Sequence, residues 1–368
     1  FHTLIPGQKP LCTWISGDFG SGKSHLLKIL SYVLENDFPI DGRPCADIFA
    51  EKAEDFELRG DIQKACRIPT ESVLFNIQEK LDATTKSTID PVLNIFVKEF
   101  NRKLGYDDKK PEIAEIERYF DNKGKYEYFK QEYERRFGET WENGRKSILL
   151  KQQRLAELMA DIDGIDHQTA ANNIKTQIAN YKIDTDGFVS LVKAHLDKQQ
   201  PGSRFIFFVD EVGQFIGKDV HRMLSLQTIA EGLSDKTDGR SIIIVTSQMD
   251  IDATLGNLDK QQQYDFSRIQ GRFETRISLT SANADEVIQR RLLEKKPEPQ
   301  QMLCEVYQKE SHIIKSLFCF GDNSQFKSQY KNDQQFAIDF PFIDYQFYLV
   351  QSCIIELSKN NAFSGKQQ

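Results

Sequence analysis

A glycine-rich loop near the amino terminus places the strongest constraint on what this chain can fold into. Residues 11–24 read LCTWISGDFGSGKS, a short apolar run that stops at Gly17 and leads to Gly22, Lys23 and Ser24. This is the P-loop pattern, in which glycines let backbone N–H groups point at phosphate oxygens. Apolar residues then recur at helical spacing, at Leu26, Ile29, Leu30 and Val33. A strand, a phosphate-binding loop and a helix are therefore predicted in that order.

The residue types in the loop predict how a nucleotide would be held. We expect Lys23 to reach the β- and γ-phosphates and Ser24 to ligate Mg²⁺. The positive end of the following helix adds to the field at the phosphates. His25 either touches the nucleotide or packs the first helical turn. The predicted cofactors are ATP and Mg²⁺, and the predicted nucleotide-binding residues are Gly17, Asp18, Phe19, Gly20, Ser21, Gly22, Lys23, Ser24 and His25.

An apolar strand that ends in two acids supports a hydrolytic site. Residues 205–212 read FIFFVDEV, with Asp210 and Glu211 at the strand end. This is the Walker B arrangement, in which Asp210 would hold Mg²⁺ through water and Glu211 would orient or deprotonate the attacking water. The alternative is a strand that happens to end in two acids.

A second buried run with a polar end fits the same chemistry. Residues 241–248 read SIIIVTSQ. In P-loop ATPases with an extra strand between the P-loop and Walker B strands, such an end contacts the γ-phosphate or the attacking water. Ser247 or Gln248 could take that role, and we expect Thr246 to pack in the core. The alternative is a strand that simply enters a loop.

The remaining elements predict an α/β P-loop core. Further strands are expected at 72–77 and 275–279, and a helix at 223–233. The strands are unbroken apolar runs, as expected for a parallel sheet covered on both faces. The fold class predicted is therefore a parallel five-stranded sheet flanked by helices, with a helical insertion and a carboxyl-terminal helical lid.

The insertion allows two interpretations. Phe129, Tyr133 and Phe137 recur every four residues, among many basic side chains. Basic and aromatic residues together could bind DNA. The interpretation we favour is a solvated helical segment whose aromatics form a small core of their own, because acids dilute the positive charge.

A second helical region follows the last strand. In residues 281–296, Ser281 or Asn283 can cap a helix that we expect to run up to Pro297 and Pro299. Val287, Ile288, Leu292 and Leu293 should face inward, and residues 341–357 should form a buried helix. The predicted organisation is 1–85 for the first part of the ATPase core, 86–200 for the insertion, 201–281 for the second part of the core, and 282–368 for the lid and the start of a further region.

Composition narrows the class of protein. The chain has 368 residues and a formal net charge of -7, which argues against nucleic-acid binding over the whole surface but leaves room for a local basic groove. No run is long and apolar enough to span a membrane. The scattered cysteines are typical of reduced thiols, and we expect a cytoplasmic location.

Longer stretches carry a more specific resemblance. The segments GDFGSGKSHLLK, FFVDEVGQFIG, FSRIQGRFETRISLTSANADEVIQRRLLEK and PFIDYQFYLVQ resemble the P-loop ATPases of BREX (bacteriophage exclusion) systems, the BrxC/PglY family. The resemblance implies the ATPase part of a larger bacterial phage-defence protein. It implies a homo-oligomer whose partners are a methyltransferase, a PglZ-type protein and other BREX components, with DNA reached through the complex.

The core also resembles the AAA+ class, and this resemblance implies that an arginine takes part in the site. In that class an arginine near a Gly-Arg-Phe element reaches the γ-phosphate of a neighbouring subunit. Arg272 matches this position and Arg268 is the second choice; the alternative is that both are surface arginines of a turn. Arg290 and Arg291 could instead sense nucleotide within their own subunit.

Two functional classes remain from the sequence. One is an oligomeric ATPase that assembles or remodels a DNA-associated defence complex. The other is a nucleotide-gated scaffold that recruits partners with little hydrolysis. Glu211 favours the first, because a pure binder needs no catalytic carboxylate there. A small-molecule kinase fits less well, since the acidic pair and the polar strand end suit water as nucleophile.

Overall fold

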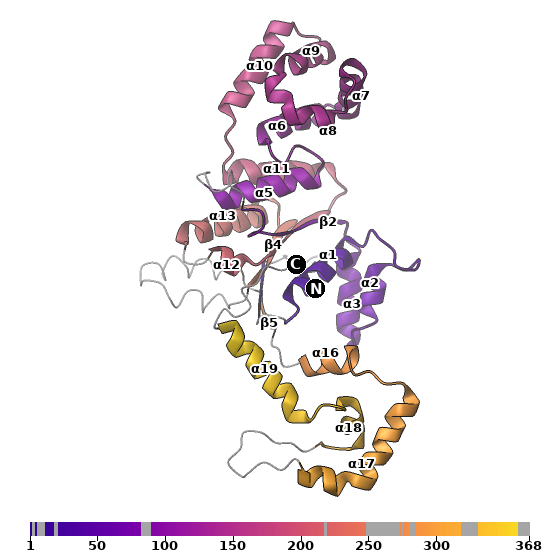
Figure 1. Ribbon diagram of the computed structural model, residues 1–368. Helices are drawn as coiled ribbons and strands as arrows, with labels where there is room; N and C mark the ends of the chain where they lie inside the picture. The colour runs from indigo at the N-terminus through magenta and orange to yellow at the C-terminus, as the bar shows by residue number, and fades with distance from the viewer. Residues whose placement is uncertain are drawn as a thin grey trace. The chain divides into compact units, whose positions relative to one another are not determined.

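The computed structural model describes most of the chain and divides it into two compact units (Figure 1). The core unit has Phe1–Trp14, Ser24–Ser247 and Ile251–Arg276, and the carboxyl-terminal unit has Ile15–Lys23, Gln248–Asp250 and Ile277–Gln368. The described residues are 1, 4–5, 12–17, 21–81, 90–216, 219–247, 273, 275–279, 284–317 and 330–359.

Within the described residues, five parallel strands form one sheet in the order β2-β3-β4-β1-β5. The strands are β1 (Thr13–Gly17), β2 (Thr70–Asn76), β3 (Arg204–Asp210), β4 (Ser241–Ser247) and β5 (Thr275–Leu279). β4 is buried along its whole length and β3 up to its last residue, which explains their unbroken apolar runs. The α/β class, the five-stranded parallel sheet and the place of β4 between β1 and β3 are thereby confirmed.

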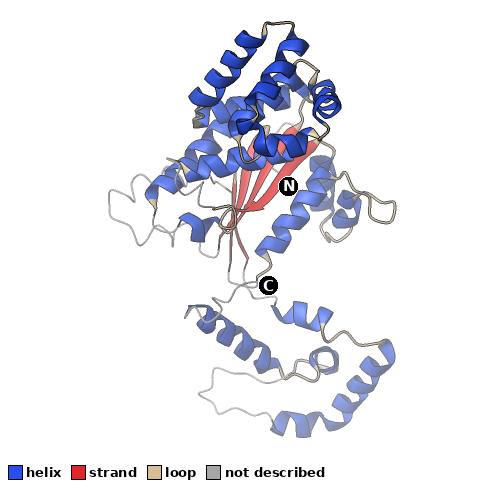
Figure 2. Ribbon diagram, turned by 45° about the horizontal axis from the view of Figure 1, so that its top comes forward, coloured by secondary structure: helices blue, strands red, loops and turns tan. Residues whose placement is uncertain are grey.

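Helices flank this sheet on both sides (Figure 2). α5, α11 and α13 pack against β2, β3 and β4, where the Phe96 and Phe207 ring centroids lie 5.2 Å apart. The predicted helices at 26–33 and 223–233 are confirmed as α1 and α13. The helices of this layer set are α1 (Lys23–Glu35), α2 (Cys45–Ala50), α3 (Phe56–Cys66), α5 (Pro91–Lys103), α11 (Thr185–Lys198), α12 (Val212–Ile216) and α13 (Val220–Lys236).

Between α5 and α11 lies a helical body with its own apolar core, as favoured from the sequence. Phe129 and Tyr133 are fully buried in that core, which spans Ile113 to Ile174. Because α5 and α11 belong to the sheet layers, the body fills only the middle of the predicted 86–200 segment. Its elements are α6 (Pro111–Asn122), α7 (Tyr126–Phe137), α8 (Trp141–Gly144), the 3₁₀ helix η2 (Arg145–Leu150), α9 (Gln152–Asp163) and α10 (His167–Asn180).

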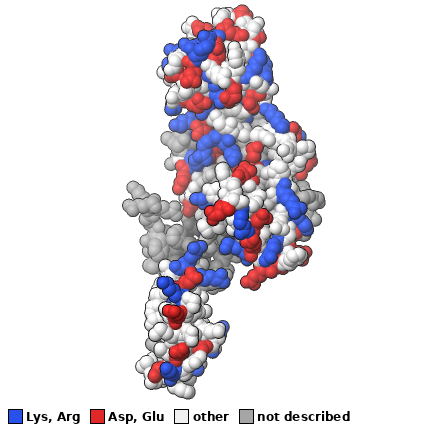
Figure 3. All heavy atoms as spheres, turned by 90° about the vertical axis from the view of Figure 1, so that its right-hand side faces the viewer, with Lys and Arg blue, Asp and Glu red and all other residues white. Residues whose placement is uncertain are grey.

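The charges of this helical body are largely paired. Arg136 bridges Glu132 and Asp161, and Arg154 pairs with Glu139. Figure 3 shows acidic and basic side chains intermingled over the body's visible face. On the described residues of that face, the charges therefore form no uniformly positive track of the kind that follows a nucleic-acid backbone.

The carboxyl-terminal unit corrects two sequence predictions. α16 (Ala284–Arg291) ends before Leu292, which is 77% exposed, so the prediction that Leu292 faces inward is wrong. Pro297 does not stop that helix but begins another, α17 (Pro297–Leu317), because a proline lacks only an N–H that the first helical turn leaves unpaired.

The last helix leaves several large apolar side chains exposed. In α19 (Asp344–Lys359), Phe347 is buried whereas Tyr348, Leu349 and Val350 are exposed, so the predicted buried helix is wrong in its burial though right in its place. α18 (Asp333–Asp339) packs on α17 through Phe336 and Tyr307. No helix among the described residues has the length and apolar character needed to cross a membrane.

Candidate functional site

The glycine-rich loop after β1 begins at a glycine that no other residue could replace without a shift. β1 ends at Gly17, where an added Cβ would lie 2.3 Å from the Leu279 carbonyl oxygen and 2.7 Å from Ser21 Oγ. Gly22, just before α1, has φ 86°, which favours glycine. Asp18, Phe19 and Gly20 lie outside the described residues.

The described end of the loop fits a phosphate group. Lys23 is 9% exposed and its Nζ donates to the Gly17 carbonyl oxygen at 2.8 Å. Ser21 Oγ is buried and has no hydrogen-bond partner among the described residues. Phosphate oxygens would accept from both groups and from the N–H groups at the start of α1. Ser24 and His25 are exposed in the first turn of α1, so His25 does not pack that turn.

The acidic pair stands where the chain leaves β3. Asp210 is the last residue of β3, and Glu211 follows with φ 59°. This left-handed conformation costs a non-glycine residue about 1–2 kcal/mol. The Glu211 N–H donates to Asp210 Oδ1 and to Thr246 Oγ1, each at 3.1 Å. A strained backbone held by such contacts is typical of functional positions.

The Glu211 carboxylate is held by a residue that the sequence interpretation missed. Asn76 ends β2 opposite Asp210, and its Nδ2 donates to Glu211 Oε2 at 2.9 Å. Asn76 Oδ1 accepts from the backbone N–H of Gln78 at 2.9 Å, which fixes the direction of the amide group. A polar residue ending an apolar strand was the available signal, but its neighbour lies 135 positions away.

Within the part of the chain that the structure describes, each carboxylate of the acidic pair keeps one oxygen open. Among the described residues, no protein donor binds Asp210 Oδ2 or Glu211 Oε1. Both residues are half-buried, so water or a ligand can reach them. An acceptor fixed by one hydrogen bond and open on its other oxygen suits proton transfer or the binding of a hydrated cation.

The end of β4 differs from its prediction. Thr246, expected only to pack, donates its hydroxyl to Asp210 Oδ1 and accepts the Glu211 N–H. Ser247 lies at the strand end as predicted but is 1% exposed, and its Oγ would be 2.0 Å from a Cβ at Gly213. Gln248, Arg268 and Arg272 lie outside the described residues.

The donor set fits Mg²⁺ rather than a cation held by protein alone. Across the described ranges, no group of three or more His, Cys, Asp or Glu side chains could hold a metal ion. Mg²⁺ usually keeps several waters and takes one or two protein ligands together with phosphates. The Ser24 hydroxyl and the open oxygen of Asp210 would serve in that way.

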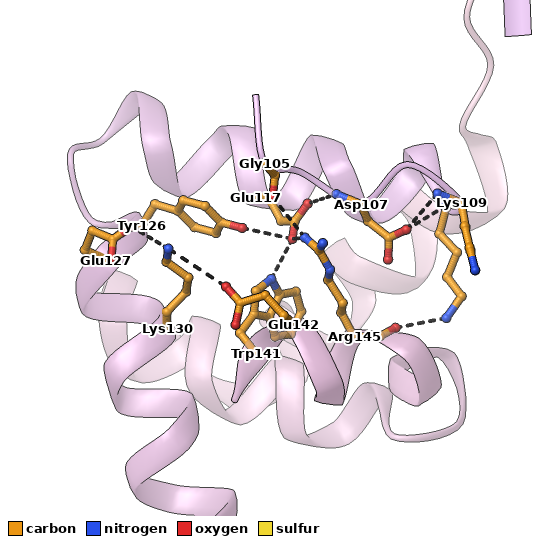
Figure 4. Close-up of polar contacts among 11 residues, drawn as sticks. Gly105, Asp107, Lys109, Glu117, Tyr126, Glu127, Lys130, Trp141, Glu142 and Arg145 are labelled. Atoms are coloured by element: carbon orange, nitrogen blue, oxygen red, sulfur yellow. Dashed lines mark hydrogen bonds and ion pairs between the residues drawn. The ribbon is translucent and has the colours of Figure 1, made fainter. Parts of the chain in front are cut away.

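A second polar cluster lies in the helical body, around the fully buried Glu117 (Figure 4). Its carboxylate accepts from the Asp107 N–H at 2.5 Å, the Trp141 Nε1 at 2.6 Å, the Arg145 guanidinium at 2.7 Å and the Tyr126 hydroxyl at 3.0 Å. Burial, and then the Glu117 charge, raise the pKa of Tyr126. Both Glu117 oxygens accept hydrogen bonds from the protein, so this cluster joins helices and its carboxylate is already satisfied.

No protein-family model matches the chain, and no solved structure matches it. The functional conclusion therefore rests on the motifs and geometry of the chain itself.

Proposed function

We propose that this protein binds ATP with Mg²⁺ and hydrolyses it, as a P-loop ATPase of AAA+-like architecture. The observation that carries this function is Glu211: a left-handed residue beside Asp210, held by Asn76 on one oxygen and open on the other. In open parallel α/β sheets, ligands bind outside the carboxyl ends of the strands. The P-loop follows β1 and the acidic pair ends β3, with β4 between them in the strand order.

Each residue then has a chemical role. Lys23 and the N–H groups at the start of α1 neutralise and orient the phosphates. Asp210, through its open oxygen, and the Ser24 hydroxyl are the groups that would hold a hydrated cation. Glu211 takes a proton from the attacking water at Oε1 while Asn76 fixes Oε2. Mg²⁺, when bound, offsets negative charge on the phosphates.

Replacement of Lys23 tests the function directly. Lys23→Ala removes the charge on the phosphates, and we expect ATP affinity in isothermal titration, or phosphate release, to fall at least about a hundredfold. Lys28→Ala, exposed one turn along α1, is the matched control. Unchanged affinity together with unchanged hydrolysis in Lys23→Ala would overturn the assignment.

Membership of a BREX system is supported by the sequence resemblance. The resembling stretches predict a cytoplasmic phage-defence ATPase that works with a methyltransferase and a PglZ-type protein on DNA. We expect the full-length protein to co-purify with those components, and Lys23→Ala to abolish phage resistance while keeping the complex. Full resistance with Lys23→Ala, or no association with either component, would contradict this assignment.

A homo-oligomer with a trans-acting arginine completes the proposal. Arg272, or else Arg268, would neutralise transition-state charge in a neighbouring subunit, worth about a thousandfold or more in rate. Mixing full-length Lys23→Ala and Arg272→Ala should restore part of the activity, because some interfaces pair an intact loop with an intact arginine. No recovery in confirmed mixed oligomers would assign Arg272 a different role.

The alternative is a nucleotide-gated scaffold with little turnover. The Glu211 carboxylate, with Oε2 bound by Asn76 and Oε1 open among the described residues, favours hydrolysis, because binding alone needs no positioned base. Tight ATP binding without phosphate release, by the full-length protein with its partners and DNA present, would favour the scaffold.

A further inference from the structure

We infer that Thr246 is a positioning residue of the proposed ATPase site, which through one hydroxyl fixes the backbone of Glu211 and selects which Asp210 oxygen stays open. This inference rests on the proposed function for its catalytic meaning. The hydrogen bonds of Thr246 to Asp210 and Glu211, both within the core unit, do not depend on that function.

The hydroxyl of Thr246 links two groups in a fixed direction. A carboxylate only accepts and an amide N–H only donates, so the Thr246 proton goes to Asp210 and its lone pair to the Glu211 N–H. Thr246 is 0% exposed, so solvent does not replace these bonds. The buried hydroxyl is therefore committed to the acidic pair.

Two consequences for the pair follow. Asp210 Oδ1 receives both the Thr246 hydroxyl and the Glu211 N–H, which leaves Oδ2 as the oxygen open to a hydrated cation. The Glu211 N–H donates to Asp210 Oδ1 and to Thr246 Oγ1, each at 3.1 Å, and these two bonds hold the residue in its left-handed conformation. Loss of the hydroxyl removes one of these anchors, and the backbone can relax away from the geometry that directs the Glu211 carboxylate to Asn76.

The end of α13, just before β4, supplies a matched control. Thr237 is also 0% exposed, and its hydroxyl likewise donates once, to the Leu233 carbonyl, and accepts once, from the Ser241 N–H at 2.8 Å. Thr237→Val therefore removes an equivalent buried hydroxyl that binds the first residue of β4, without touching the acidic pair. The comparison separates a general loss of stability from a loss of positioning.

Steady-state kinetics give the first test. In the full-length protein, Thr246→Val should lower kcat at least about tenfold while KM for ATP stays within about twofold. Thr246→Ser, which keeps the hydroxyl, should recover most of the turnover. Thr237→Val should lose a similar amount of thermal stability and keep its kcat. Wild-type kcat in Thr246→Val, or no recovery in Thr246→Ser, would overturn the inference.

Amide hydrogen exchange gives a second test that needs no nucleotide. In the ligand-free protein, the Glu211 amide should exchange faster in Thr246→Val than in wild type, and at the wild-type rate in Thr246→Ser and Thr237→Val. If Thr246→Val does not fold, Thr246→Ala carries the same comparison. Unchanged exchange at Glu211 would show that Thr246 does not anchor it. Should the wild type lack turnover under every condition, the proposed function fails, and the exchange result still decides the anchoring.

Discussion

Two glutamates of this protein show how differently a carboxylate can be used. Glu117, in the helical body, is fully buried and accepts hydrogen bonds at both oxygens from the backbone, Trp141, Arg145 and Tyr126. Glu211, at the end of β3, is half-buried, has one oxygen held by Asn76 and stands on a left-handed backbone. Both oxygens of Glu117 accept hydrogen bonds from the protein, whereas among the described residues only one oxygen of Glu211 does.

The difference teaches how a carboxylate with a structural role can be told from one placed to act on a ligand. A buried carboxylate is tolerated when donors use all its capacity, and it then stabilises its surroundings. A carboxylate with an open oxygen and local strain gains nothing for folding from either feature, and both are typical of sites that act on a ligand. The two glutamates should therefore respond in opposite ways to the same substitution.

The largest expected effect is on turnover. Glu211→Gln keeps the shape of the side chain and loses the base, so we expect kcat to fall about 10²- to 10⁴-fold. ATP affinity and melting temperature should stay near wild type, because the amide can still accept from Asn76. Equal phosphate release by the full-length wild type and variant would place the base elsewhere and remove the contrast with Glu117.

The same change at Glu117 should act on stability alone. Glu117→Gln leaves Arg145 facing a neutral group in a buried site, which should cost about 3–5 kcal/mol in urea unfolding of the helical body. Turnover per folded molecule should not change. A variant as stable as wild type would show that the cluster tolerates loss of its charge, and the distinction between the two glutamates would weaken.

Two glycines extend the comparison to packing. A Cβ at Gly144 would lie 2.2 Å from the hydroxyl and 2.5 Å from ring atoms of the buried Tyr133, whereas one at Gly213 would lie 2.0 Å from Ser247 Oγ. A hydroxyl can rotate away and an enclosed ring cannot. Gly144→Ala should therefore cost about 1–3 kcal/mol and Gly213→Ala less, by urea unfolding. The reverse order would mean that the end of β4 is the more rigid of the two regions.

The smallest effect concerns pH. Hydrogen bonds from Arg135 and then Arg136 hold the pKa of Glu132 at about 2, below its ordinary 4.5. A lowered folded-state pKa gives stability that is present above the ordinary pKa and is lost as the pH falls toward the folded value. The stability difference between wild type and Glu132→Gln should thus be constant above about pH 5 and vanish near about pH 2. A difference that persists in acid would point to packing instead of charge.

The sheet could be predicted from the sequence because its signal is local. Buried parallel strands read as unbroken apolar runs, so 205–212 and 241–248 were recognisable. The range 275–279 matched β5 at both ends, but the three central residues of β5 are exposed, so the prediction that this strand is covered on both faces is wrong. The P-loop glycines and the start of α1 follow from the motif itself. The prediction that side chains of the last helices are buried was wrong for Leu292 and for one face of α19. Their burial depends on where each helix ends and on which other residues cover it, and neither can be read from a local pattern.

The contacts that complete the candidate site could not be predicted in the same way. Asn76 and Glu211 meet only because β2 and β3 are neighbours in register, across a long insertion. Thr246 looked like one more residue of an apolar run, and its polar role depends on the strand beside it. Nothing in the spacing of apolar and acidic residues along α6 distinguishes Glu117, which is buried, from the other acids of this helix. Such pairings are properties of topology and not of local pattern.

The helical body is joined to the core by two chain segments that lie close together. The chain leaves the core after α5 and returns at α11, and the rings of Phe100 and Phe188, near those two junctions, have centroids 5.9 Å apart. A segment whose two ends are adjacent can be gained, lost or exchanged by a lineage without disturbing the host sheet. We therefore expect that a short linker in place of the body would leave the core with an intact strand order.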